Sequence, residues 1–269
     1  MRLILLFAFI AWAFACNNPK DSENTTNKPS GYPVFVQDLL NEIKRFPDSI
    51  ELRVQLIDTM DSLQLTKDAL QQIDSLISKD PGNYGNWFKK GELAIQDTDT
   101  ALAIKSFSSA AAIYNTPDVL LTLANLYAAQ KNKLALTLCT QVITQKPDRT
   151  YIAHSYYIVG LYYENTGNTG AAIENFNTCI QQNYYYLDAY LEIGWIYFDQ
   201  QKYSLAKEIF ETATAVKPTD ARGHYWTAKC LEKLEQPDKA MNAYQLALKL
   251  DNSLSEASAA ISRIKQTKK

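Results

Sequence analysis

The chain has 269 residues, of which 46% are hydrophobic and only nine are Gly and nine are Pro. So few turn-forming residues exclude a turn-rich β-sandwich or a glycine-looped α/β enzyme, and so many apolar residues exclude a disordered chain. The 27 basic and 29 acidic residues nearly balance, and no basic cluster stands out. Binding to nucleic acid is therefore not expected, because it requires a surface that neutralises phosphates.

Residues 1–15 have the pattern of a signal peptide. One Arg precedes an apolar run that ends at Ala15. As a helix this run would rise about 20 Å, less than the roughly 30 Å of a bilayer core, so a cleaved signal is favoured over a membrane span. The segment AFAC, which ends at Cys16, resembles the lipobox of bacterial lipoproteins. That resemblance implies lipidation of Cys16; the alternative is an ordinary cleaved signal with an incidental Cys.

Residues 16–31 are expected to form a flexible tether between the lipid and a folded domain. After Cys16 they contain no large apolar side chain, which is typical of a linker. One acyl chain binds membranes only marginally, so stable anchoring requires several, as the lipoprotein family supplies. Asn17 follows the Cys, and under the enterobacterial sorting rule this residue favours the outer membrane. The predicted location is therefore the cell envelope, lipid-anchored at the outer membrane and facing the periplasm.

The rest of the chain repeats with a period near 34 residues. An Ala recurs at intervals of 34, 32, 37, 34 and 34 residues, and four residues after each comes a larger side chain, Phe in three cases. The six are Ala69, Ala103, Ala135, Ala172, Ala206 and Ala240. A Gly lies twelve residues before three of them. This pattern resembles the tetratricopeptide repeat, in which each unit is a pair of antiparallel helices.

The resemblance implies an all-α fold, a right-handed α-solenoid of about six helix pairs with a capping helix at each end. Small residues let the two helices of a unit approach closely, and no unit buries its apolar face without its neighbours. The predicted units are 50–83, 84–116, 117–152, 153–186, 187–220 and 221–254, with an N-terminal cap in 32–49 and a C-terminal cap in 255–269. The first unit has Ile57 where the motif has a small residue, and about three extra residues precede the fourth unit.

No arrangement of residues indicates catalysis. The chain has no glycine-rich phosphate loop, no HExxH, no Cys-x-x-Cys and no GxSxG. Its two His, His154 and His224, and its scattered carboxylates suggest no metal or cofactor site. Cys139, Cys179 and Cys230 follow the helical packing pattern and are expected to be structural free thiols. The sequence therefore predicts a non-enzymatic protein without metal or cofactor.

In the tetratricopeptide family, the first helix of each unit lines a concave groove. Carried onto this sequence, the groove positions predict a partly aromatic surface that holds a peptide or helix of a protein partner. The predicted groove residues are Phe88, Tyr157, Leu161, Leu191, Trp195, Phe198, Tyr225 and Lys229. The alternative is that neighbouring helices or an end cap cover these side chains.

The leading functional hypothesis is a membrane-anchored adaptor that holds another protein during assembly of a cell-envelope complex. At the level of architecture, six repeats behind a lipobox resemble the outer-membrane lipoproteins that help pilus secretins or outer-membrane proteins to assemble. Fold analogy alone does not fix a function. The alternatives are a recruiter of cell-wall enzymes, a periplasmic receptor for a peptide or glycan, and, from a third class, an enzyme.

Overall fold

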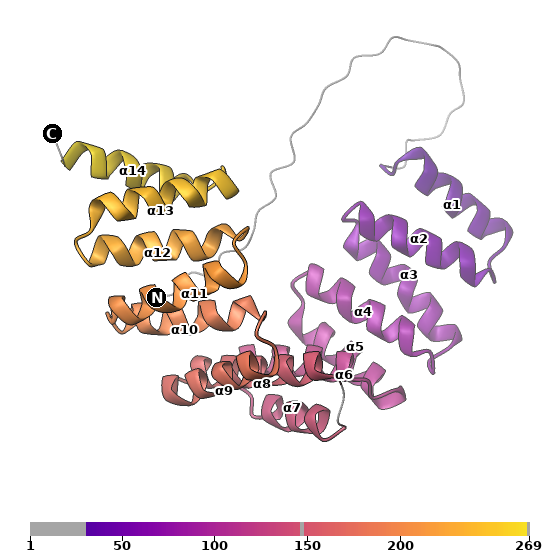
Figure 1. The fold of residues 1–269 in the computed structure, drawn as a ribbon. Coiled ribbons are helices and arrows are strands. Elements are labelled where there is room, and N and C mark those ends of the chain that lie inside the picture. The colour runs from indigo at the N-terminus through magenta and orange to yellow at the C-terminus, as the bar shows by residue number, and fades with distance from the viewer. Residues whose placement is uncertain (1–30, 146–147, 268–269) are drawn as a thin grey trace, which may run out of the picture.

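The computed structural model describes residues 31–145 and 148–267, and over those ranges it consists of α-helices joined by turns and loops (Figure 1). The predicted signal peptide, Cys16 and the tether up to residue 30 lie outside the described residues. A single helix, α1 (Val34–Arg45), precedes six helix pairs, and another, α14 (Ser255–Thr267), follows them. The pairs are α2 (Ile50–Ser62) with α3 (Thr66–Lys79), α4 (Tyr84–Gln96) with α5 (Thr100–Ile113), α6 (Pro117–Ala129) with α7 (Leu134–Thr144), α8 (Arg149–Asn165) with α9 (Thr169–Gln182), α10 (Leu187–Asp199) with α11 (Tyr203–Val216), and α12 (Ala221–Lys233) with α13 (Pro237–Leu250).

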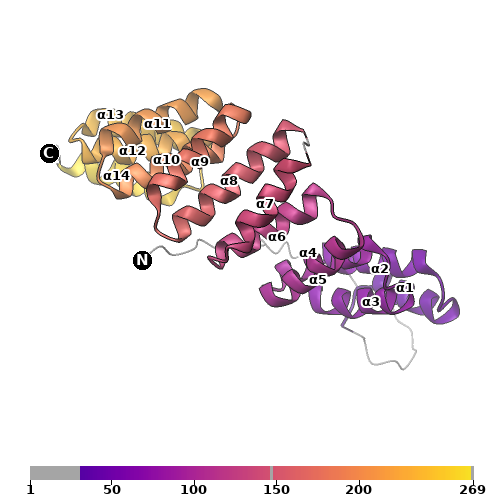
Figure 2. The same ribbon diagram turned by 90° about the horizontal axis from the view of Figure 1, so that it is seen from below.

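The helices stack in chain order along an arc, with α1 to α5 in one arm and α9 to α14 in the other (Figures 1 and 2). Each helix packs mainly on the helices before and after it, and α6 also contacts α8 past the short α7. This is the all-α solenoid that the repeat predicts. Within the described ranges, no helix has the length and apolar character needed to cross a bilayer.

The closest approach within a unit pairs a small residue on the first helix with a ring on the second. A Cβ placed on Gly194 would lie 2.5 Å from the ring of Phe210, which is fully buried. Gly91 with Phe107 and Gly160 with Phe176 repeat this contact. All six recurring Ala residues are fully buried as well. The small positions of the repeat thus lie where two helices come together, as predicted.

Other units fill the same place differently. The first unit has Ile57 and Ile73, which are 1% and 2% exposed. The third unit has Ala124 and Cys139, both fully buried. Each combination fills the contact between two helices, and a filled contact is what the close packing of protein interiors requires.

The first helix of the fourth unit is longer than those of the other units. Helix α8 starts at Arg149 rather than at residue 153, and it has 17 residues where the other five first helices have 13. The Asp148 carboxylate caps the helix by accepting a hydrogen bond from the Thr150 N–H at 2.8 Å. The extra residues of the 37-residue interval therefore add a helical turn instead of lengthening a loop, because an N-cap residue lies directly before them.

The turn inside every unit contains one residue with left-handed backbone. These residues have φ between 57° and 84°, a region that favours Gly. They are Gln64, Thr98, Lys131, Gly167, Gln201 and Glu235. Only the fourth unit uses Gly there, so five of the six turns hold a side chain in an unfavourable conformation.

The two single helices close the ends of the stack. Helix α1 buries Val36 and Ile43 against the first pair. Helix α14 packs on α13 and buries four apolar residues, Ala257, Ala260, Ile261 and Ile264. The rest of α14 is mostly polar, so that it ends the apolar core.

Candidate protein-binding face

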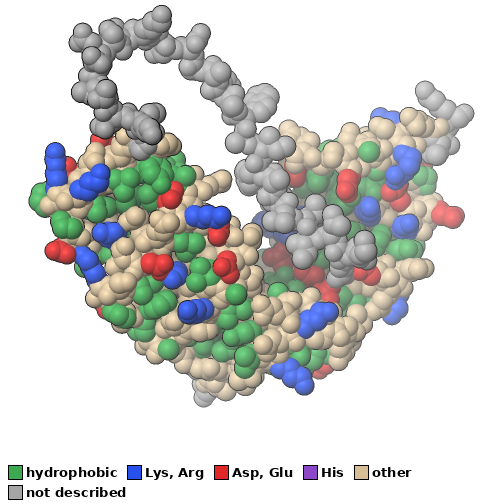
Figure 3. All heavy atoms as spheres, turned by 180° about the vertical axis from the view of Figure 1, so that it is seen from behind, with side chains coloured by type: hydrophobic (Ala, Val, Ile, Leu, Met, Phe, Trp, Pro, Cys, Tyr) green, Lys and Arg blue, Asp and Glu red, His purple; other side chains and the backbone are tan. Residues whose placement is uncertain are grey.

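The first helices of neighbouring units present one continuous surface, here called the first-helix face. It is defined by the side chains that join α6, α8, α10 and α12 across unit boundaries. The Tyr151 hydroxyl donates a hydrogen bond to Asp118 (3.3 Å), and the Tyr157 hydroxyl donates one to Glu192 (3.3 Å). Acidic side chains gather in the hollow between the two arms of the arc (Figure 3).

The structure corrects two of the predicted groove residues. Leu191 is fully buried and packs with Ala206 and Phe210 in the core of the fifth unit. Tyr225 is only 9% exposed and belongs to the core that α12 shares with α13 and α14. Their helix position turns toward the second helix of the unit rather than toward the open face, so neither side chain is available to a partner in this structure.

The other predicted residues are partly buried. Trp195 and Phe198 pack edge-on against Trp226, with ring centroids 5.8 and 5.4 Å apart. Lys229 lies over the same Trp226 ring, 5.8 Å from its centroid. The last three, Phe88, Tyr157 and Leu161, pack against the cores of the second and fourth units. The expected apolar strip is thus mostly covered by neighbouring rings, and the most exposed positions of the face are polar.

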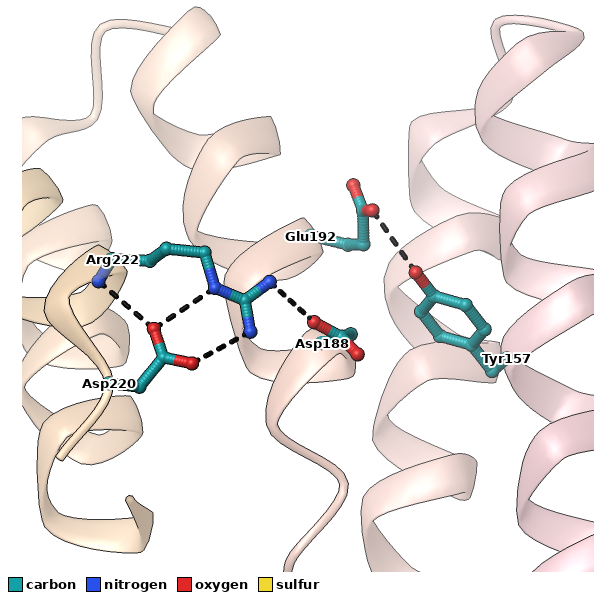
Figure 4. A network of polar contacts seen from close by, with 5 residues as sticks. All are labelled: Tyr157, Asp188, Glu192, Asp220 and Arg222. Atoms are coloured by element: carbon teal, nitrogen blue, oxygen red, sulfur yellow. Dashed lines mark hydrogen bonds and ion pairs between the residues drawn. The ribbon is translucent and has the colours of Figure 1, made fainter. Parts of the chain in front are cut away.

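An ion-pair bridge joins the fifth and sixth units. The guanidinium of Arg222 contacts Asp188 at 2.8 Å and Asp220 at 2.9 Å (Figure 4). The Arg222 side chain lowers the pKa of Asp220 mainly by donating hydrogen bonds to it. Asp188 and Arg222 occupy the second position of α10 and of α12, so the bridge connects equivalent positions of successive units.

A cleft lies between α6 and α8, here called the His154 cleft. It has a volume of about 390 Å³ and is lined by residues of three units. They are Phe88, Asp118, Leu121, Thr122, Asn125, Thr150, Tyr151, His154 and Tyr186. The Nδ1 of His154 is 2.5 Å from the hydroxyl of Tyr186. Burial lowers the pKa of His154 below its ordinary value, so the imidazole is neutral at pH 7.

The His154 cleft shares only one residue, Phe88, with the predicted groove. Asp118, Tyr151 and Tyr186 were not among the predictions, because Tyr151 lies in the extra turn of α8 and Tyr186 lies in the loop before α10. The available signal was the spacing of about one repeat between hydrogen-bonded partners, 33 residues for Tyr151 with Asp118 and 32 for His154 with Tyr186.

The first helices of the N-terminal arm carry a cluster of ion-paired side chains. The ammonium of Lys89 is 2.6 Å from Asp61 and 3.7 Å from Asp58. Burial raises the pKa of nearby Glu92. The first helices of this arm therefore present ion-paired charges, and they also expose the apolar side chains of Ile50 and Val54.

The described residues contain no group of three or more His, Cys, Asp or Glu side chains that could hold a metal ion. Burial raises the pKa of each of the three thiols to about 12, so Cys139, Cys179 and Cys230 are protonated at neutral pH. A protonated, buried thiol is a poor nucleophile. What the face offers is hydrogen bonds, charge and aromatic surface, the chemistry of recognition.

Models of the tetratricopeptide repeat family match residues 153–184 and 191–255. With the same helix pairs continuing through the N-terminal half, the chain is a tetratricopeptide repeat protein. This repeat is a protein-interaction module, so the chain belongs to a class of scaffolds that bind other proteins. No curated protein sequence is significantly similar to it.

Solved structures with the same fold are distant in sequence. A tetratricopeptide repeat protein from Parabacteroides merdae has 14% identity and a TM-score of 0.64, with 86% of this chain and 91% of that one covered. PilW, a type IV pilus biogenesis factor, has 15% identity and a TM-score of 0.62, covering 80% and 97%. PilF of Pseudomonas aeruginosa has 15% identity and a TM-score of 0.58, covering 81% and 97%. At such low sequence identities, the structural similarity shows a shared fold alone.

Proposed function

We propose that the protein is a lipid-anchored adaptor of the cell envelope that holds a segment of another protein on its first-helix face while an envelope complex assembles. The observation that carries this proposal is the continuity of that face. Polar side chains join α6, α8, α10 and α12 across three unit boundaries, so that one extended segment can contact several units at once.

The similarity to PilW, described as a type IV pilus biogenesis factor, supports an assembly role. The lipobox-like segment before Cys16 supports anchoring in the envelope. A helical or extended peptide bound along a groove is a common way for a solenoid to recognise a partner. A scaffold also explains a surface rich in recognition groups, with its three described thiols buried and protonated.

The test of the binding face is site-specific photo-crosslinking in intact cells. A photoreactive residue replaces Asn125 or Asp199, which are exposed on first helices, or Lys105 or Thr140, which are exposed on second helices. The two first-helix positions should capture the same protein, and the two second-helix positions should not. Capture of identical proteins from all four positions would contradict a specific binding face.

The anchor is tested separately. Cys16→Ser should abolish labelling of the protein with a radioactive fatty acid and release the repeat domain from the membrane fraction. Its circular dichroism should stay unchanged, because no described helix includes residue 16. Labelling that persists in the variant would remove the lipid from the proposed function.

A further inference from the structure

We infer that the partner segment presents a Lys or Arg side chain to the His154 cleft, where its cation pairs with Asp118. This inference rests on the proposed function and names the chemistry of the partner. Two equivalent positions of the repeat, Asp118 and Asp188, differ because, among the described residues, only Asp188 is paired with a cation of the protein itself.

Asp118 and Asp188 occupy the same position, the second residue of α6 and of α10. Asp188 is paired with the guanidinium of Arg222, which comes from the second position of a following first helix. The equivalent residue of the unit after Asp118 is His154, which the extra turn of α8 places one turn further into its helix. Since its imidazole is neutral at pH 7, the third and fourth units contain the carboxylate of this bridge without its cation.

The carboxylate of Asp118 is accessible and lacks an ion-pair partner among the described residues. Asp118 is exposed, and the Tyr151 hydroxyl donates a hydrogen bond to it at 3.3 Å. Asp118 and Asp148 both raise the pKa of Tyr151 by charge repulsion, which reports a negative potential at the mouth of the cleft. An incoming guanidinium or ammonium would be attracted there, as Arg222 is by Asp188.

The walls of the cleft suit the same group. Phe88, Tyr151 and Tyr186 contribute aromatic rings, and a cation is stabilised over the face of such a ring. The sixth unit shows this contact within the protein, because the ammonium of Lys229 lies 5.7 Å from the centroid of the Tyr225 ring. The volume of about 390 Å³ holds one long side chain rather than a folded element.

The test measures binding of fluorescein-labelled peptides to the full-length protein in detergent. One peptide carries four Arg residues spaced by Gly and Ser, and its control carries citrulline, the neutral isostere, at the same places. The Arg peptide should bind at least tenfold more tightly than the citrulline peptide. Equal affinities would overturn the inference.

Three variants locate the site. Asp118→Asn should weaken binding of the Arg peptide about tenfold, and the matched control Glu174→Gln, an exposed carboxylate on α9, should leave it within twofold. His154→Arg should weaken binding at least as much, because the new guanidinium would pair with Asp118 as Arg222 pairs with Asp188. Equal effects of Asp118→Asn and Glu174→Gln would mean attraction to the whole surface and would overturn the cleft as the site.

The crosslinked partner gives an independent reading. If its captured segment, identified by mass spectrometry, contains a Lys or Arg and loses capture when that residue becomes Gln, the inference is supported. If capture at Asn125 is strong but independent of every basic residue in the segment, the inference fails while the adaptor function stands. If neither Asn125 nor Asp199 captures a specific protein, the adaptor function itself fails.

Discussion

The first and fifth units fill the same interhelical space in opposite ways. The fifth unit places Gly194 against a full ring, Phe210, whereas the first unit places Ile57 against Ile73, and all these contacts are buried. The family models match the fourth to sixth units, including the fifth, and do not extend to the first. The comparison shows that the fold requires a filled contact between the two helices. The residue types that fill this contact differ from unit to unit.

The largest effect should come from emptying the contact in the first unit. Ile57→Ala removes three buried carbons and should lower the free energy of unfolding by about 3 kcal/mol, through lost burial and a cavity. Ile50→Ala, at a position 56% exposed, should cost less than about 1 kcal/mol. Chemical denaturation followed by circular dichroism measures both changes. Adding Ile73→Phe to Ile57→Ala should restore part of the loss, since a ring would fill the space.

Overfilling the contact in the fifth unit should be the next largest effect. Gly194→Ala puts a Cβ 2.5 Å from the buried ring of Phe210 and should cost about 2 kcal/mol. Phe210→Leu in the same chain should recover part of that cost, so the two substitutions should be coupled in a double-mutant cycle. Gly170→Ala is the control, because its new Cβ would meet only an Asn168 oxygen at 3.8 Å. Additive effects of the Gly194 and Phe210 substitutions would refute the contact.

The intra-unit turns give a smaller and reciprocal pair of effects. Thr98 has a φ of 60° and is β-branched, whereas Gly167 has a φ of 84° without steric cost. Thr98→Gly should therefore raise the free energy of unfolding by about 1 kcal/mol, and Gly167→Thr should lower it by a similar amount. Thermal melts of the two variants test this. A loss of stability in both would mean that the Thr98 side chain contributes more than its backbone costs.

The buried thiols make stability fall in alkali. Burial raises the pKa of Cys139, Cys179 and Cys230 to about 12 in the folded protein, against an ordinary value near 8.5. Above that ordinary value the unfolded chain loses these protons while the folded chain keeps them, so unfolding becomes more favourable. The melting temperature should drop steadily from pH 9 upward, and less so in a variant with all three Cys replaced by Ala. An equal drop in that variant would assign the effect to tyrosines instead.

The smallest effects should distinguish the ion pairs of the two arms. The side chains of Lys89 and Asp61 are 28% and 19% exposed, against 47% and 50% for Arg222 and Asp188. Lys89→Gln should therefore cost about 1 kcal/mol and respond little to salt, whereas Arg222→Gln should cost about 0.5 kcal/mol and lose that effect in concentrated salt. Melting temperatures at low and high ionic strength make this comparison. The opposite order would place the stronger bridge in the C-terminal arm.

The fold follows from the sequence because its signal is repeated. Each recurring Ala, such as Ala206, marks a buried helix contact, and six copies of one pattern average out the irregularities of any single unit. Residue 153 begins the repeat motif of the fourth unit, where the family model also begins, but the helix itself starts one turn earlier because Asp148 caps it. The 37-residue interval shows that residues are added there, but whether they lengthen a loop or a helix depends on the local cap.

The candidate site was harder to predict because burial on a first helix depends on the neighbouring units. Leu191 and Tyr225 have the residue types of a binding surface, yet α11 and α13 cover them. The His154 cleft combines residues from three units, and it is distinguished by the missing cation at the position of His154. This difference is recognised only when His154 is compared with Arg222, the charged residue at the equivalent position of the sixth unit.

The neighbour-only packing of the arc has a mechanical consequence. Because the extensive helix contacts join neighbours along the stack and the two arms are connected through α6 to α8, a small rotation at each interface adds up along the stack. The solenoid should therefore be elastic. When the arc opens, the length of the first-helix face changes while each helix interface keeps its own contacts. A bound segment that bridges the arms would make the solenoid stiffer. Binding at the face would then set the curvature that the adaptor presents to the rest of an assembly.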